Sequence, residues 1–328
     1  MKNIQVDIKS GNFKQVYLLY GEEAYLKQQY KQNLVKALNP DGDTMNFNHY
    51  EGKGIDVKQL IDLCETMPFF AERRVVLLED TGFFKNKCEE LADYMKELPD
   101  YLYLVFAETE VDKRNRMYKA VKACGSIAEF IRQDEKTLMR WAAGILGKAG
   151  KKITQRDMEL LLTKTGTDMG NLRMEMEKLI SYTEGRDVVN AEDIEEICTT
   201  QTTNRIFDMV RAVTEKNQKR ALELYYDLLT LKEPPMRILF LLAKQYRQLL
   251  LAKQFAAAGL AQTEIASKLG VPGFVVRNIT TCARAYTISE LEQAVKDFVD
   301  AEESVKTGRL EDKLSVELLI IKYSSKVK

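Results

Sequence analysis

The turn after the first apolar run of the chain holds part of a phosphate-binding motif. A P-loop reads G-x-x-x-x-G-K-[ST], because its glycines let backbone amides converge on phosphate, its lysine supplies charge and its hydroxyl binds Mg²⁺. The window Gly21–Gln28 keeps the first glycine and, at Lys27, the lysine. Leu26 replaces the second glycine and Gln28 the hydroxyl residue, while Glu22–Glu23 fills the space meant for an anion. Two carboxylates there would repel a triphosphate by ~4 kcal/mol per close pair at intermediate dielectric. We therefore expect no nucleotide binding of the ordinary kind and no cofactor.

An acidic pair, Glu79–Asp80, follows the third apolar run, where a Walker B motif would hold Mg²⁺. Without a phosphate to bridge, the simpler interpretation is that these residues cap the next turn. One alternative stays open, an active ATPase in which Lys27 and Asp80 still bind Mg·ATP in an altered loop.

Other catalytic chemistry is restricted by the single histidine, His49. A Ser-His-Asp triad would have to use it, and a His-rich metal site is excluded. Because its neighbours alternate as in a strand, a partly exposed structural histidine is the favoured interpretation. We expect neither catalysis nor a bound metal in this chain.

Three large apolar residues, Met67, Phe69 and Phe70, cluster where a helix is predicted to end and a strand to begin. Taken alone, such residues more often pack into a core. Yet adjacent phenylalanines in a loop do not both turn inward easily, and an exposed apolar pair marks a binding site. Filling a pocket with these side chains could supply roughly 1.5–3 kcal/mol each, which is the scale of an interface hot spot.

The first ~130 residues must position these groups, and they alternate between apolar strand patterns and helical patterns. Strands are expected at 16–20, 45–50, 75–78, 101–106 and 127–131, and helices at 24–38, 57–66, 87–98 and 114–123. Continuous apolar strands separated by helices are typical of parallel β-α-β units covered on both faces. The sequence therefore predicts an open α/β sheet.

After residue 131 the strand signal ends and only helices are expected. They are predicted at 136–149, 157–165, 171–183, 191–198, 203–215, 218–231, 235–258, 263–269, 272–285, 289–307 and 310–323. With 328 residues, two or three domains are expected, and we place them at 1–133, 134–200 and 201–328. The fold class is thus α/β plus all-α.

Composition excludes several functional classes. The 49 basic and 49 acidic residues balance, which argues against a protein that coats nucleic acid or anionic membrane by bulk charge. No run approaches the ~20 apolar residues of a membrane span, and the first residues lack a signal-peptide core. The five scattered cysteines indicate reduced thiols, mostly core fillers, in a cytoplasmic protein.

Two further segments could contact DNA. Lys148, Lys151 and Lys152 form the clearest basic cluster, which is most often a solvated turn but could touch phosphate. The segment Thr263–Arg277 has a helix-turn-helix pattern, but its second helix offers mainly Arg277 and Asn278 among apolar residues. Packing within a helical domain is the favoured interpretation, with a DNA-binding regulator as the alternative.

Four segments spread over nearly the whole chain carry a family resemblance. They are Tyr17–Glu23 with Tyr25 and Leu26, Met67–Arg74 running into Val75–Leu78, Gly166–Asp168 with Leu172 and Glu175–Leu179, and Leu269–Pro272. In these segments the chain resembles the delta-subunit family of bacterial DNA polymerase III, whose members are clamp-loader proteins of the AAA+ class. The resemblance implies a degenerate AAA+ domain, a small helical lid and a C-terminal helical collar for oligomerisation.

The resemblance also implies a function. Delta subunits do not bind ATP; they bind the ring-shaped beta sliding clamp and hold one interface open, so that the ring can be placed around primed DNA. The family's clamp contact maps onto Met67, Phe69 and Phe70, with Pro68 as a turn-former. Implied partners are ATP-binding subunits of the tau/gamma type, a delta-prime-type subunit, and primed DNA within the assembly. Catalysis would belong to the DNA polymerase III holoenzyme. With the family match, surface exposure becomes the favoured interpretation of the apolar cluster.

Overall fold

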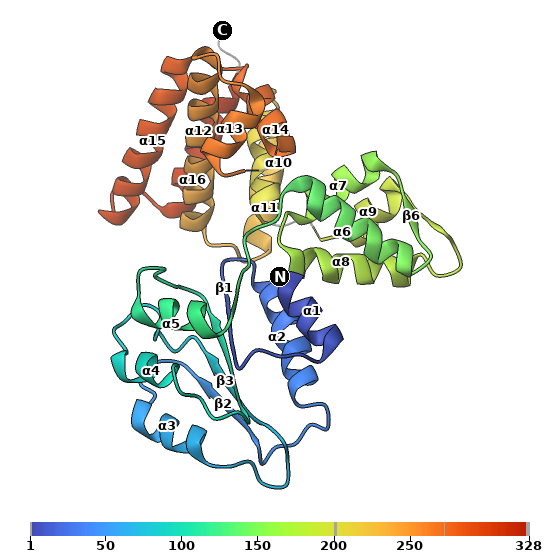
Figure 1. The fold of residues 1–328 in the computed structure, drawn as a ribbon. Coiled ribbons are helices and arrows are strands. Elements are labelled where there is room, and N and C mark those ends of the chain that lie inside the picture. Colours follow the sequence, from blue (N-terminus) through green and yellow to red (C-terminus); the bar gives the residue numbers. More distant parts are fainter. Residues whose placement is uncertain (1, 200–201, 272, 326–328) are drawn as a thin grey trace. The chain divides into compact units, whose positions relative to one another are not determined.

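The computed structural model describes residues 2–199, 202–271 and 273–325. It divides into two compact units, residues 1–133 and 134–328, and the ribbon changes there from a sheet with flanking helices to a mainly helical part (Figure 1). Within the described ranges, no helix is long and apolar enough to cross a membrane.

The first unit is built on a five-stranded parallel sheet. Its strands are β1 (Val16–Tyr20), β2 (Phe47–Glu51), β3 (Arg74–Glu79), β4 (Leu102–Glu108) and β5 (Ser126–Glu129). They lie in the order β2-β3-β4-β1-β5, and each neighbouring pair is parallel. All five carboxyl ends therefore lie along one edge of the sheet. The predicted open α/β sheet is confirmed.

Helices cover both faces of this sheet. They are α1 (Lys2–Ser10), α2 (Ala24–Leu38), α3 (Val57–Glu65), α4 (Glu89–Tyr94) and α5 (Arg116–Cys124). Alternate residues of β1 point to opposite faces: Tyr17 and Leu19 pack with α1 and α2, whereas Val16 and Leu18 pack with α3, α4 and α5. Burial on both faces explains why the strands are continuously apolar.

Several elements differ from the sequence prediction. Helix α1 was not expected, but Ile4 is fully buried against the sheet and gives the segment an apolar side. Helix α4 is shorter than the predicted 87–98, because Met95 and the residues after it continue as turns. The parallel pair β6 (Lys152–Ile153) and β7 (Val188–Val189) is too short to produce an alternating pattern.

The second unit begins with four helices whose starts are fixed by side-chain caps. These helices are α6 (Glu135–Lys148), α7 (Gln155–Thr165), α8 (Met169–Tyr182) and α9 (Ala191–Ile197). Asp134, Thr154, Asp168 and Asn190 each accept a hydrogen bond from a first-turn backbone amide. Such caps satisfy amides that have no partner within the helix.

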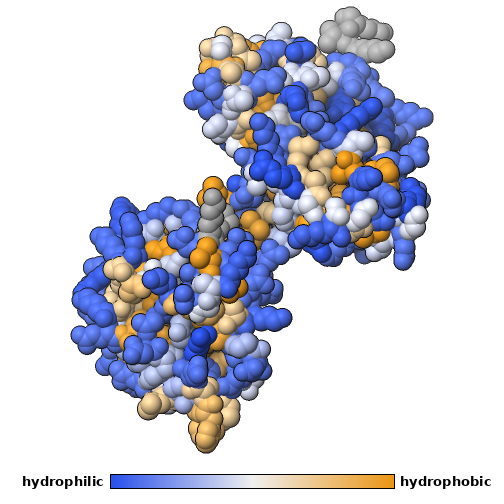
Figure 2. Space-filling view, turned by 45° about the vertical axis from the view of Figure 1, so that its right-hand side comes forward, coloured by the Kyte–Doolittle hydropathy of each residue, from blue (hydrophilic) through white to orange (hydrophobic). Residues whose placement is uncertain are grey.

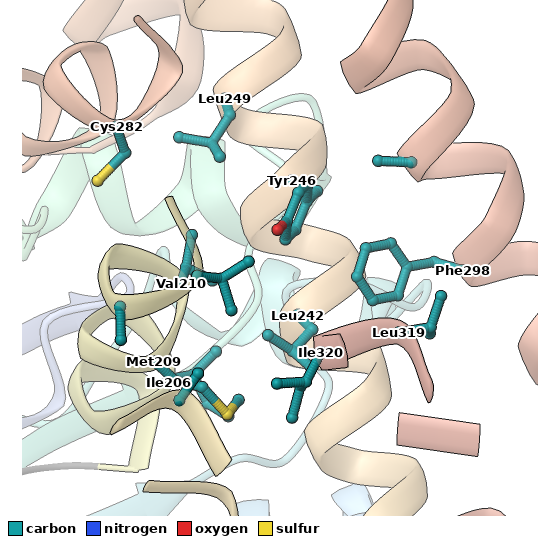
Figure 3. Packing of buried hydrophobic residues seen from close by; sticks show 14 of the residues in the cluster. Ile206, Met209, Val210, Leu242, Tyr246, Leu249, Cys282, Phe298, Leu319 and Ile320 are labelled. Atoms are coloured by element: carbon teal, nitrogen blue, oxygen red, sulfur yellow. The ribbon is translucent and has the colours of Figure 1, made fainter. Parts of the chain in front are cut away.

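The remaining helices surround one long helix. They are α10 (Thr202–Thr214), α11 (Gln218–Thr230), α12 (Pro235–Ala257), α13 (Gln262–Leu269), α14 (Gly273–Ala283), α15 (Ile288–Lys306) and α16 (Asp312–Ser324). Leu242 and Tyr246 of α12 lie between Val210 of α10 and Phe298 of α15 (Figure 3). The division of this unit into a lid (134–200) and a collar (201–328) stays a prediction.

All five cysteines are free thiols, and their burial follows the expected use as small core residues in most cases. Cys64, Cys198 and Cys282 are buried, Cys88 is half-buried and Cys124 is exposed. Burial raises the pKa of the Cys64 and Cys198 thiols to about 12, which keeps them protonated.

Candidate protein-binding site

The loop of residues 66–73, between α3 and β3, presents the three apolar side chains to solvent. Met67 is 74% exposed, Phe69 56% and Phe70 95%, while Pro68 is half-buried. The two phenylalanine rings meet edge to face with their centroids 4.5 Å apart. Figure 2 shows a hydrophobic projection at the lowest point of the view, where this loop runs in Figure 1. We call Met67, Phe69 and Phe70 the apolar tip. It is not part of the core.

The backbone of the apolar tip has an unfavourable conformation. Phe70 has φ +50°, in the left-handed region. For a residue with a bulky side chain this conformation costs ~1–2 kcal/mol. Such strain persists only where the surroundings fix the loop.

One of these fixing contacts comes from Asn46, which directly precedes β2 and is buried. Its side-chain amide donates to the carbonyl oxygen of Phe69 at 2.8 Å, and its Oδ1 accepts from the Phe69 amide at 2.6 Å. The same amide group donates to Asp43. Phe69 is therefore held at both of its backbone polar groups by one side chain from another segment.

A second fixing contact comes from Arg74, the buried first residue of β3. Its Nε donates to the carbonyl oxygen of Thr66 at 2.8 Å and its Nη2 to that of Met67 at 3.3 Å. Thr66 is the C-cap of α3, so the guanidinium supplies a cation at the negative end of the helix. Its Nη1 donates to Asn48 at 3.2 Å.

Neither Asn46 nor Arg74 is among the site residues predicted from the sequence. Arg74 did give one signal, because a charge placed directly before a continuous apolar strand must find partners on burial. Nothing in the sequence connects Asn46 with a loop more than twenty residues later.

The turn that corresponds to a P-loop is closed by the chain itself. The Glu23 amide donates to the Phe130 carbonyl oxygen at 3.0 Å, and the Phe130 amide donates to Tyr20 at 2.7 Å. A phosphate cradle needs such amides to point at the ligand. Gly21 has φ +121°, and a Cβ added there would lie 2.3 Å from the Phe130 oxygen. Glycine is therefore required at position 21 because the Phe130 backbone leaves no room for a side chain.

Gly21→Ala is expected to lower the free energy of unfolding by about 2 kcal/mol, because the added Cβ meets a backbone oxygen and the backbone is left-handed. The matched control is Gly54→Ala, at φ +93° with no atom within 4 Å of the added Cβ. Strain alone should cost the control about 1 kcal/mol. Urea unfolding of both variants measures the difference, and equal losses would show that Phe130 does not close the turn.

The ammonium group of Lys27 is also bound by the chain. Its Nζ donates to the Glu108 carbonyl oxygen at 2.9 Å and lies 3.5 Å from the hydroxyl of Thr109. Burial lowers the pKa of Lys27, while the nearby carboxylates of Asp80, Glu108 and Glu79 oppose that shift. Lys27 therefore binds the backbone at the carboxyl end of β4.

The acidic residues at the carboxyl edge of the sheet have protein partners as well. Glu79 accepts from Lys31 at 2.6 Å and lies 2.9 Å from His49 Nε2, and Asp80 accepts from the Thr109 amide at 2.8 Å. His49 is an exposed strand residue with 41% of its side chain accessible, which agrees with the predicted partly exposed strand histidine. Among the residues that the structure describes, no three His, Cys, Asp or Glu side chains gather as a metal site requires.

The carboxylate of Glu108 lies at the same edge and is also enclosed. It accepts hydrogen bonds from the Thr81 amide and hydroxyl and from the Gly82 amide. Burial raises the pKa of Glu108, although these hydrogen bonds oppose the shift. A Mg²⁺ ion at this edge would have to displace existing contacts of Glu79, Asp80 or Glu108.

The predicted basic cluster is divided by the structure. Lys148 and Lys152 are exposed, but Lys151 donates to the carbonyl oxygens of Thr183 and Arg186 at 2.6 Å each. These bonds tie Lys151 to the turn after α8. DNA contact by Lys148, Lys151 and Lys152 stays a prediction, and Lys151 would have to leave two carbonyls to make it.

The helix-turn-helix-like segment corresponds to α13 and α14. Ile265, Val276 and Ile279 are buried in the core around α12, while Arg277 is exposed. These three apolar residues therefore pack within the helical core, as the favoured interpretation expected.

Fold and site together define a class: an α/β domain of the nucleotide-binding type whose phosphate turn is closed and whose sheet carries an exposed apolar loop, followed by helices. The sequence model for "DNA polymerase III, delta subunit" matches residues 17–130, and that for its C-terminal domain matches residues 203–323. Together they span more than two thirds of the chain. The chain belongs to the delta-subunit family of DNA polymerase III.

Individual relatives agree with this assignment. The DNA polymerase III subunit delta of Bacillus subtilis is 26% identical, with 96% of this chain and 94% of that protein covered. A probable DNA polymerase III subunit delta of Aquifex aeolicus is 22% identical, with 78% and 75% covered. The solved Bacillus subtilis DNA clamp loader delta protein has the same fold, with a TM-score of 0.67, 23% identity and 99% of each chain covered. This chain is a clamp-loader subunit of the DNA replication machinery.

Proposed function

We propose that this subunit binds the sliding clamp through Met67, Phe69 and Phe70 and holds one interface of the ring open for loading onto primed DNA. The observation that carries the proposal is the exposure of three large apolar side chains on one loop. The backbone of this loop is fixed by hydrogen bonds with the buried Asn46 and Arg74. Exposed apolar clusters of this kind mark protein-binding sites.

The chemistry of the apolar tip suits a pocket on a partner protein. Burial of each side chain could supply roughly 1.5–3 kcal/mol, because all three side chains are largely in contact with water in the free chain. Phe70, at 95% exposure, has the most to gain. A few such anchors dominate the affinity of most protein interfaces.

The closed phosphate turn supports a role without ATP binding or catalysis in this chain. The cycle would draw its energy from ATP bound by partner subunits of the tau/gamma type, assembled with a delta-prime-type subunit. Their nucleotide state would shift the population in which the apolar tip is free to reach the clamp.

The direct test is a titration of fluorescently labelled sliding clamp with the purified chain in nucleotide-free buffer. Saturable binding with a defined stoichiometry is expected. Absence of binding at micromolar concentrations, with the chain shown to be folded by circular dichroism, would contradict the proposal.

Lys27→Met separates this proposal from an altered-loop ATPase. We expect unchanged clamp affinity and unchanged ATP hydrolysis by the reconstituted loader, because Lys27 contacts Glu108 and Thr109. Loss of its hydrogen bond should lower the free energy of unfolding by only about 1 kcal/mol. The same substitution of the P-loop lysine in an ATP-binding partner subunit is the control. Loss of the hydrolysis that depends on this chain's own nucleotide site would support the ATPase alternative.

A further inference from the structure

Two buried side chains outside the apolar tip hold its backbone. Asn46 and Arg74 are 4% and 5% exposed, so neither presents a surface to a partner. Between them they bond both backbone polar groups of Phe69 and the carbonyl oxygens of Thr66 and Met67. We propose that Asn46 and Arg74 are positioning residues that preorganise the apolar tip for clamp binding. This inference rests on the proposed function.

An exposed turn can satisfy its backbone groups with water, so it does not need buried polar partners for that purpose. Burying an amide and a guanidinium is unfavourable unless each is bonded. Here four of the six hydrogen bonds of these two groups go to the backbone of the loop of residues 66–73, and the result is one fixed conformation that includes the left-handed Phe70.

A fixed conformation matters because binding orders whatever was mobile. A loop that must be ordered on association loses affinity relative to one that is already in place. The two anchors act at different points: Arg74 holds the start of the loop at the end of α3, and Asn46 holds its centre at Phe69. Together they keep Met67, Phe69 and Phe70 directed outward as a unit.

Asn46→Ala tests the inference, with Asn115→Ala as the matched control. Asn115 is also an asparagine that makes three bonds to loop and helix backbone of the same unit, to Phe83, Asn86 and Met117. For Asn46→Ala we expect clamp affinity to fall about tenfold, with slower association and faster dissociation. For Asn115→Ala the affinity should stay within about twofold of wild type, although both variants lose a comparable set of hydrogen bonds.

Hydrogen exchange gives a readout that needs no clamp. In the wild-type chain the Phe69 amide donates to Asn46 Oδ1 at 2.6 Å, which should protect it from exchange. We expect this protection to disappear in Asn46→Ala while amides in β1 and β4 keep theirs. For Arg74, clamp affinity should fall from wild type to Arg74→Lys and further to Arg74→Met. Lysine retains a cation and a hydrogen-bond donor but not the forked geometry of the guanidinium group.

A double-mutant comparison separates positioning from general destabilisation. Asn46 affects binding only by positioning the two phenylalanine rings. Asn46→Ala should therefore cause no further loss of clamp affinity in the Phe69→Ala/Phe70→Ala variant, which lacks both rings. Wild-type clamp affinity in Asn46→Ala, or an equal loss in Asn115→Ala, would overturn the inference. If the wild-type chain fails to bind clamp, the proposed function fails, while unchanged Phe69 exchange in Asn46→Ala rejects preorganisation alone.

Discussion

Replacing Phe69 and Phe70 together by alanine is expected to weaken clamp binding more than ~100-fold, because two rings worth roughly 1.5–3 kcal/mol each are removed and ~1.4 kcal/mol is a factor of ten. The rings are 56% and 95% exposed, so truncation leaves no cavity in the core. The free energy of unfolding should therefore change little. Titration of labelled clamp and urea unfolding of the same preparations measure both quantities.

The matched control for this variant is Val6→Ala with Ile131→Ala. Both residues are 61% exposed and belong to the same unit, so the pair also loses exposed apolar area. We expect the control to bind clamp as the wild-type chain does. Wild-type affinity in the folded Phe69→Ala/Phe70→Ala variant would contradict the assignment of the apolar tip as the clamp-binding site.

Phe70→Gly is expected to lower clamp affinity at least ~10-fold without destabilising the fold. Phe70 has φ +50°, which glycine adopts freely and phenylalanine does not. Relief of ~1–2 kcal/mol of strain should offset the ~0.5–1 kcal/mol that glycine adds through the freedom of the unfolded chain. Clamp affinity would then fall without a loss of stability, whereas a misfolded variant would lose both.

Phe69→Gly provides the comparison, since Phe69 is not among the described residues with positive φ. That variant should lose affinity and also about 0.5–1 kcal/mol of stability. If Phe70→Gly destabilised the chain as much as Phe69→Gly, the strain at Phe70 would not be real. If it kept wild-type affinity, the ring of Phe70 would not be a clamp contact.

Much of the fold could be predicted because burial on both faces of a parallel sheet leaves a strong signal. Strand β1 and helix α2 have the predicted bounds, since an apolar run ending at Gly21 and a helix ending before Pro40 are sharp local features. Helix α1 was missed because its apolar side depends on Ile4 meeting the sheet. The short β6–β7 pair exists only through long-range pairing.

Only the local features of the candidate site could be predicted from the sequence. Adjacent phenylalanines in a turn left exposure open, and the family resemblance made it the favoured interpretation. The loss of the second P-loop glycine and of the hydroxyl residue indicated that the phosphate turn had changed. The contacts that fix both features come from distant segments. Phe130 closes the turn at Glu23, and Asn46 holds Phe69. No local pattern predicts such contacts, because they depend on how the strands are ordered in the sheet.

The most direct test of the account is a distance measurement across one interface of the sliding clamp, with a fluorophore on each side. Adding the isolated wild-type chain without nucleotide should increase the separation, and adding the Phe69→Ala/Phe70→Ala variant should not. An interface that stays closed with the wild-type chain, or that opens equally with the variant, would contradict it.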